Sequence, residues 1–361
     1  MSVKANARLV MASLSLLTFA ATTPTQDASS QNLDQNAKQT IVLPLELVAA
    51  QPVTLAVLTA NGHIAPGVKV VLSSGEVVTT DESGRAHFLV PPEKGLMFAR
   101  IPGTEVREAA DVLPQGSGSG SLQLAQIPKL VSLENHFAIS GSGFQGDADR
   151  NRIEAGGKAI LVLASSPVQL VVMPPANAPL GPASLVTIEG ATEIATQITF
   201  VEVVPSNTSE AVQIRRGKKA AIVLRVRGTA EPLDLEIRNL SPQVAQFPHS
   251  NEMRVRTAGG SDNSAVIRLK GMSAGPFSYA VSLENTSRIA NAPMARDFLE
   301  AARKIAQPAA VNRVSAILKE LRGDNVDAVK IRNNLRAISD QGGSEDFQAL
   351  IRAAFRALDG E

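Results

Sequence analysis

The sequence predicts a mainly β protein, built as tandem β-sandwiches followed by a short α-helical C-terminal segment. Between residues 40 and 290, short β-branched segments alternate with turns rich in Gly, Asn and Pro, which is typical of sandwich strands. After Pro293 the apolar residues recur at helical intervals instead. Hydrophobic residues make up 44% of the chain but aromatic residues only 3%, so its cores must be aliphatic.

The N-terminus carries the pattern of a secretory signal. Lys4 and Arg8 precede an apolar run over residues 9–20, and the small residues Ala20 to Thr22 follow. An uncleaved anchor is the alternative, but the run is shorter than the roughly 20 residues that span a bilayer. We therefore expect residues 1–22 to be a cleaved signal, and the protein to be periplasmic or extracellular without a membrane span.

The composition of the chain excludes some classes of structure and partner. Residues 23–39 are polar without apolar periodicity, which predicts a disordered linker. The chain has no Cys, so disulfides play no part. A formal net charge of +1, no Trp and a single Tyr argue against nucleic acid as a partner, because such sites need a basic field or stacking aromatics.

Residues 40–114 are predicted to form the first sandwich. Its strand candidates are 53–58, 68–72, 76–80 and 86–90. The pattern of its glycines resembles carboxypeptidase regulatory-like domains, which have an immunoglobulin-like fold. The matching residues are Gly62, Gly67, Val70, Gly75, Thr80, Asp81, Gly84 and Phe88. The resemblance implies a structural turn at Asp81 and Gly84, and no peptidase activity.

Residues 115–126 are rich in Gly and Ser and predict a flexible joint. The next module, 127–204, resembles the IPT/TIG family of immunoglobulin-like domains. Four segments carry the resemblance: Phe137–Phe144, Asn151–Ala159, Val168–Met173 and Gly181–Ile188. This resemblance implies a binding or spacing module, with no ligand specified.

A third immunoglobulin-like sandwich is predicted over residues 205–290. The segment 193–204 either closes the second sandwich or bridges to the third, and the sequence leaves both alternatives open. The strand candidates of the third sandwich are 212–214, 220–227, 233–237, 253–256, 265–269 and 277–283.

Residues 291–361 predict three or four short amphipathic helices, with Ser344 as an N-cap. Each helix must bury its apolar stripe. The stripes pack against one another, or they dock on the third sandwich or on another chain, which would allow oligomerisation. The stripe residues are Met294, Phe298, Ala302, Ile305, Val311, Val314, Leu318, Leu321, Ala328, Ile331, Leu335, Ile338, Phe347, Leu350, Ala354, Phe355 and Leu358.

Patterns that suggest chemistry are weak. Ser273 lies in a G-x-S-x-G match, but Pro276 and a strand follow where a nucleophile elbow needs a helix. Asp147, Asp149 and Asn151 start like a calcium loop, whose later glycine and glutamate positions are not filled. The histidines are isolated from one another: His63, His87, His136 and His249. We therefore predict no enzyme, and no catalytic, cofactor-binding or metal-binding residues.

The densest basic patch is Arg215, Arg216, Lys218 and Lys219, followed by Arg225 and Arg227 on an alternating strand. A hairpin end that presents these cations is suited to an anionic surface. The alternative is a charged edge strand that prevents edge-to-edge aggregation. The first four residues are our candidate partner contacts.

Together these features predict an exported, non-enzymatic binding, adhesion or scaffold protein of the cell envelope or extracellular space. Its expected partner is a protein or a polysaccharide. The alternative is an accessory subunit, or a non-catalytic module partner, of a secreted carbohydrate-active or peptidase system. No segment outside the three sandwiches is large enough for a catalytic domain, which favours the first interpretation.

Overall fold

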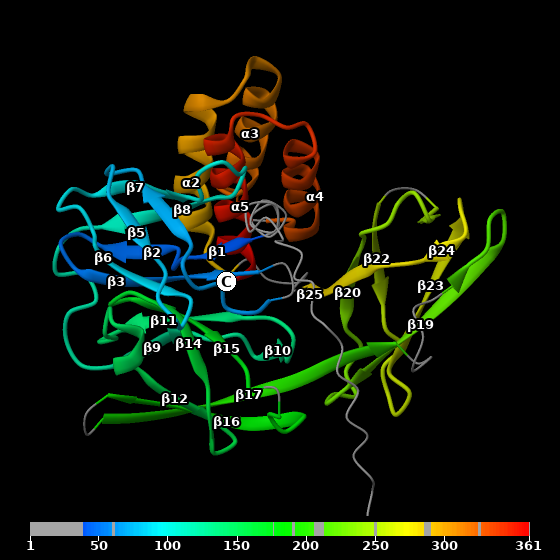
Figure 1. Ribbon diagram of the computed structural model, residues 1–361, viewed down its shortest axis with the longest axis horizontal. Coiled ribbons are helices and arrows are strands. Elements are labelled where there is room, and N and C mark those ends of the chain that lie inside the picture. The colour runs from blue at the N-terminus through cyan, green and yellow to red at the C-terminus, as the bar shows by residue number, and fades with distance from the viewer. Residues whose placement is uncertain are drawn as a thin grey trace, which may run out of the picture.

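The structure, a computed structural model, describes residues 39–59, 62–175, 177–189, 192–205, 213–248, 251–284, 290–323 and 326–360. The described residues form three β-sandwiches and four C-terminal helices, as the sequence predicts (Figure 1). The first two sandwiches lie against each other, the third lies to one side, and the helices cover the first. The expected signal and residues 23–38 of the expected linker lie outside the described residues.

The first sandwich has one sheet of β1, β3 and β6, and a second sheet in the order β2-β8-β7-β4-β5. Alternate side chains of both sheets point inward and form an aliphatic core that includes Leu55, Val70 and Met97. Its strands are β1 (Thr40–Val42), β2 (Glu46–Val48), β3 (Pro52–Leu58), β4 (Lys69–Leu72), β5 (Val77–Thr79), β6 (Arg85–Leu89), β7 (Gly95–Arg100) and β8 (Arg107–Leu113).

The second sandwich packs the strands β14-β15-β11-β9 against β13-β12-β16-β17, with β10 parallel to β17. Ile139, Ile153, Leu185 and Phe200 are buried between these sheets. Its strands are β9 (Gln123–Gln126), β10 (Leu130–Ser132), β11 (Phe137–Ser142), β12 (Arg152–Ala155), β13 (Lys158–Ala159), β14 (Leu161–Ser165), β15 (Gln169–Met173), β16 (Gly181–Glu189) and β17 (Thr192–Pro205).

Part of the segment expected as a flexible joint is a strand instead. β9 occupies residues 123–126 and pairs with β11. Glycine makes this close pairing possible, because a Cβ on Gly141 would lie 2.0 Å from the Gln123 carbonyl oxygen. Leu122, which is buried, anchors the start of the strand in the second core. Within the expected joint itself Gly118 also packs closely, because a Cβ there would lie 2.4 Å from the Val168 Cγ1 atom.

The third sandwich packs β17-β19-β23-β21 against β22-β20-β25. The long strand β17 both closes the second sandwich, by pairing with β16, and enters the third, by pairing with β19 (Figure 1). Both alternatives for residues 193–204 therefore hold at once. The remaining strands are β18 (Gln213–Ile214), β19 (Lys219–Arg227), β20 (Asp234–Asn239), β21 (Ala245–Gln246), β22 (Glu252–Arg256), β23 (Ser264–Gly271), β24 (Gly275–Pro276) and β25 (Tyr279–Glu284).

The first and second sandwiches meet at a buried polar network. Ser165 of β14 pairs with Thr54 of β3, and both hydroxyls donate to the Gly146 carbonyl, at 2.7 and 2.8 Å. Both side chains are fully buried, so each hydrogen bond is costly to lose. An apolar cluster continues this contact between the sandwiches and consists of Val42, Ala56, Leu58, Leu163, Ala164 and Val171.

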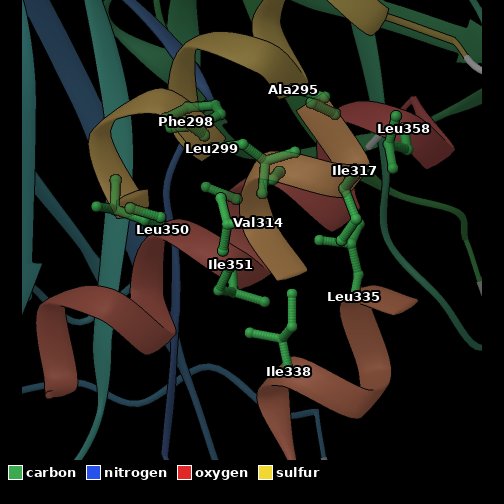
Figure 2. Packing of buried hydrophobic residues seen from close by; sticks show 14 of the residues in the cluster. Ala295, Phe298, Leu299, Val314, Ile317, Leu335, Ile338, Leu350, Ile351 and Leu358 are labelled. Carbon is green, nitrogen blue, oxygen red and sulfur yellow. The ribbon is translucent and has the colours of Figure 1, made fainter. Parts of the chain in front are cut away.

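Four helices follow the third sandwich: α2 (Ala292–Ile305), α3 (Pro308–Glu320), α4 (Ala328–Ser339) and α5 (Glu345–Asp359). Asn291, Asp327 and Ser344 cap α2, α4 and α5, as their side chains accept backbone N–H bonds. Phe298, Val314, Leu335 and Leu350 converge from the four helices into one core (Figure 2). Ile305 departs from the predicted stripe, with 47% of its surface exposed.

The same core includes Leu45 and Ala109 of the first sandwich. Helix α5 lies on the outer face of the sheet that contains β8. The sequence predicts packing of the helices on one another, on the third sandwich or on another chain, but not on the first sandwich. The stripes show that a face must be buried, but not what covers it. Most of the stripe is buried within this chain.

Polar contacts tie the helices to the first and third sandwiches, and close packing ties them to the second. Arg356 donates to the Leu43 carbonyl at 3.0 Å and approaches Glu108 at 3.4 Å on the first. Gly360 packs against Gln126 of the second. On the third, Arg336 of α4 pairs with Glu236 of β20.

Within the part of the chain that the structure describes, no helix is long and apolar enough to cross a membrane.

Candidate functional site

The four predicted contact residues lie together on the turn between β18 and β19. Gly217 gives this turn its left-handed backbone, with φ of 73°. The Gly217 N–H donates to the Gly271 carbonyl at 2.9 Å, and the Gly271 N–H donates to the Lys218 carbonyl at 2.8 Å. All four side chains are exposed, so the turn presents them from a backbone held against the end of β23.

Two further cations extend this patch along the neighbouring strand. In the register of β19 and β23, Lys219 lies opposite Lys270, and Ala221 lies opposite Arg268. All four residues are exposed on the outer face, while the alternate residues of both strands enter the core. We define the basic face as Arg215, Arg216, Lys218, Lys219, Arg268 and Lys270.

Sequence analysis missed Arg268 and Lys270 because they follow the turn patch by some 50 residues. A signal was present in the strand over residues 264–271, where buried and exposed positions alternate strictly. That alternation places both cations on the polar face. The pairing partner, however, comes only from the register.

Arg225 and Arg227, which the sequence places next to the patch, behave differently. Arg225 pairs with Asp262 at 3.2 Å and Arg227 with Glu202 at 3.1 Å. Within the described ranges, by contrast, no ion pair joins a carboxylate to any cation of the basic face. The charge is therefore balanced at one end of β19 and unbalanced at the other.

The opposite sheet of the third sandwich is also balanced. Arg256 pairs with Asp234 at 2.9 Å, and Glu236 pairs with Arg336 of α4. Arg254 lies opposite Glu236 in the strand register. The excess of positive charge thus belongs to one end of one sheet, and not to the sandwich as a whole.

The other motifs have structural roles. The Ser273 hydroxyl donates to the Gln243 carbonyl at 2.8 Å, in a turn between two strands. Asp147 caps a short 3-10 helix, and Asp149 pairs with Arg85 of the first sandwich at 2.8 Å. Across the residues placed by the structure, no group of three or more His, Asp or Glu side chains is arranged to hold a metal ion.

The histidines remain separate. His63 is exposed, and His87 shares a 2.9 Å hydrogen bond with Thr54 at the junction between the first two sandwiches. His136 is half-buried. Burial, as the larger cause, and the nearby Arg356 guanidinium, as the smaller, lower its pKa to about 4. His249 lies outside the described residues.

A cleft of about 350 Å³ opens in the helical segment, where the connection between α4 and α5 faces the start of α3. Ile305, Phe347 and Arg313 contribute to its walls. Its lining holds no carboxylate or imidazole group, so the cleft lacks a side chain for general acid or base chemistry.

No protein-family model matches the chain, and no curated protein matches it. Among solved structures, the I9-I11 tandem from titin is 11% identical, covering 68% of this chain and 95% of that one with a TM-score of 0.19. The N-terminal four Ig domains of Dscam1 isoform 4.44 are also 11% identical, covering 69% and 73% with a TM-score of 0.23.

SGBP-B from the Bacteroides ovatus mixed-linkage glucan utilization locus, solved with a mixed-linkage heptasaccharide, is 13% identical, covering 69% of this chain and 65% of that one. Its TM-score is 0.19. All three likenesses are to proteins of low identity whose overall arrangement differs. They therefore carry no argument about what this chain binds.

Proposed function

We propose that this protein is an exported, non-enzymatic binding or scaffold protein of the cell envelope or extracellular space. Its three sandwiches serve as spacers that hold the basic face exposed. The basic face, on the third sandwich, contacts an anionic partner. The signal pattern of residues 1–22 supports export, and the structural roles of Ser273 and Asp147 support the absence of catalysis.

The observation that carries this proposal is the unbalanced charge of the basic face. Edge protection, the alternative for Lys219, needs an edge strand. β19 is such a strand at Lys219, where among the described strands it pairs with β23 alone, because β17 pairs only with residues 224–227. Lys270, however, lies on β23 between β19 and β21, so edge protection does not account for it. The same sheet pairs its other arginines with carboxylates, so the positive charge at this end serves something other than the fold.

The domain assignments remain proposals. We propose an IPT/TIG-like module at residues 127–204 and a regulatory-like module at 40–114, joined through 115–126 and followed by a sandwich at 205–290 and helices at 291–361. The strand order in each sandwich supports these divisions. β17, which pairs in both the second and third sandwiches, supports treating their shared limit as a continuous strand.

Retention on envelope fractions tests the function. The variant carries Arg215→Gln, Arg216→Gln, Lys218→Gln and Lys219→Gln, and we expect it to lose most of its binding at low ionic strength while folding normally, because these side chains are exposed. Unchanged retention of a folded variant would contradict the proposal.

Truncation before Pro293 is a poor test of whether the basic face carries binding. It would expose Leu45 and Ala109, which the helices bury, and so would destabilise the first sandwich together with any loss of binding. Substitutions on the surface separate recognition from folding.

A further inference from the structure

Lys219 and Lys270 lie directly opposite each other on neighbouring antiparallel strands. Side chains in this relation point the same way from the sheet, and like charges there destabilise the pair. Arg268 lies two residues from Lys270 on the same face. Three cations therefore lie together without a carboxylate partner among the described residues.

The basic face is elongated along the strands, from the turn past the side-by-side Lys219 and Lys270 to Arg268. The strands run about 5 Å apart, and alternate residues along a strand are about 7 Å apart. Arg268 and Lys270 thus continue the cations of the turn along one direction of the sheet. Such a row suits a chain of repeated negative charges better than a single small anion, which needs several donors that converge on one point.

The surroundings of the row restrict the ligand class. Its exposed neighbours are aliphatic: Val266 is exposed over 51% of its surface, and Ala221 lies opposite Arg268. No aromatic side chain belongs to the exposed positions of β19 or β23. Single-stranded nucleic acid sites rely on aromatic stacking, and membrane-surface sites on inserted aromatic or large apolar side chains. These two strands expose no aromatic side chain, and Val266 is their only strongly exposed large apolar side chain.

We infer that Lys219, Arg268 and Lys270 form a contact row for a linear acidic polysaccharide, recognised through its repeated negative charges. This inference rests on the proposed function and names the ligand class of the basic face. The bound polyanion supplies the negative charge that no described carboxylate provides, so it reduces the repulsion between Lys219 and Lys270.

The test measures binding of the full chain to polygalacturonate, with neutral dextran as the reference polymer. The double variant Arg268→Gln, Lys270→Gln is compared with Arg225→Gln, Arg227→Gln. Both variants lose two cations from the same face of the same sheet, but the second pair already has carboxylate partners. We expect the first variant to lose affinity about tenfold and the second less than threefold at low salt.

The melting temperature and a charge-conserving variant separate a loss of contact from a loss of folding. Lys270→Gln removes a like-charge repulsion, so its melting temperature should hold or rise while binding falls. Lys270→Arg keeps the charge and should keep most of the binding. If this variant loses binding to the same extent, the row is structural and the inference is wrong.

Other outcomes also decide the matter. Equal losses in the two double variants would show that overall charge, and not the row, drives binding. Tighter binding to duplex DNA or to phosphatidylserine vesicles than to polygalacturonate would assign the row to another polyanion. A chain that binds envelope fractions through the turn residues but ignores polygalacturonate would overturn this inference and leave the proposed function standing.

Discussion

The two junctions between the sandwiches are built in opposite ways. The first and second sandwiches are joined by the pairing of β14 with β3 at Ser165 and Thr54. They rely on buried contacts between segments far apart in the sequence. The second and third share a continuous strand, β17, with a lateral contact from Arg336 to Glu236. One junction depends on packing and the other on backbone continuity.

The difference indicates how each junction responds to damage. A packed junction fails when a single buried group no longer fits, and its failure exposes apolar surface. A junction made by a continuous strand keeps its covalent connection, so the loss of a side-chain contact changes orientation more than stability. Substitutions at the two junctions should therefore differ in their effects.

Gly146→Ala should destabilise the protein by about 3 kcal/mol or more, because the added Cβ would lie 1.8 Å from the Pro52 carbonyl oxygen. Denaturant unfolding measures the loss. Gly323→Ala is the control, since its Cβ would lie 3.4 Å from the nearest neighbouring atom. Similar losses in both variants would show that the junction has room to adjust.

Thr54→Val should cost about 2 kcal/mol. The Thr54 hydroxyl donates to the Gly146 carbonyl at 2.8 Å and accepts from the Ala148 N–H at 3.1 Å. Thr187→Val is a matched control, because the buried Thr187 hydroxyl has no hydrogen-bond partner within the described chain. That variant should be neutral or slightly stabilising, as measured by the same unfolding experiment, and an equal cost would count against the polar network.

Acidification should weaken the fold through His136. Its pKa of about 4 in the folded protein lies below the ordinary value of 6.5, so the unfolded chain takes up the proton first. The resulting penalty is absent above about pH 6.5 and grows as the pH falls toward 4, reaching about 2 kcal/mol at pH 5. His136→Gln should flatten the stability profile over that window, and an unchanged slope would refute the assignment.

Glu236→Gln should cost about 1 kcal/mol or less, as its ion pair with Arg336 is only partly buried. Small-angle scattering should nevertheless show a wider range of orientations for the third sandwich. Asp234→Asn removes a carboxylate from the same strand, but its partner Arg256 lies within that sandwich. It should leave the scattering unchanged, and a matching change in both variants would argue against a lateral strut.

The sequence predicts individual elements better than their partners. The alternation over residues 219–227 and the apolar stripe over residues 345–359 each determine one element and its buried face. The cap at Ser344 is likewise local and is confirmed by its 3.2 Å bond from the Phe347 N–H. Such features depend on residues a few positions apart, which is the range that a periodic pattern describes.

The features that the sequence does not predict depend on contacts between residues far apart in the chain. Nothing near β17 indicates that its two halves pair in different sandwiches, because alternation is the same for either partner. Nothing near Ala109 indicates that helices cover it. The basic turn at residues 215–219 is visible in the sequence, whereas its extension by Arg268 and Lys270 requires the strand register.

The covering of the first sandwich by the last helices sets an order of events in the making of this protein. The face around Leu45 and Ala109 is complete when β8 ends, but the helices that close over it emerge about 180 residues later, or roughly 10 to 40 s of synthesis. During that interval the nascent chain carries an uncovered apolar surface. Closure by the C-terminal helices removes this apolar surface from solvent.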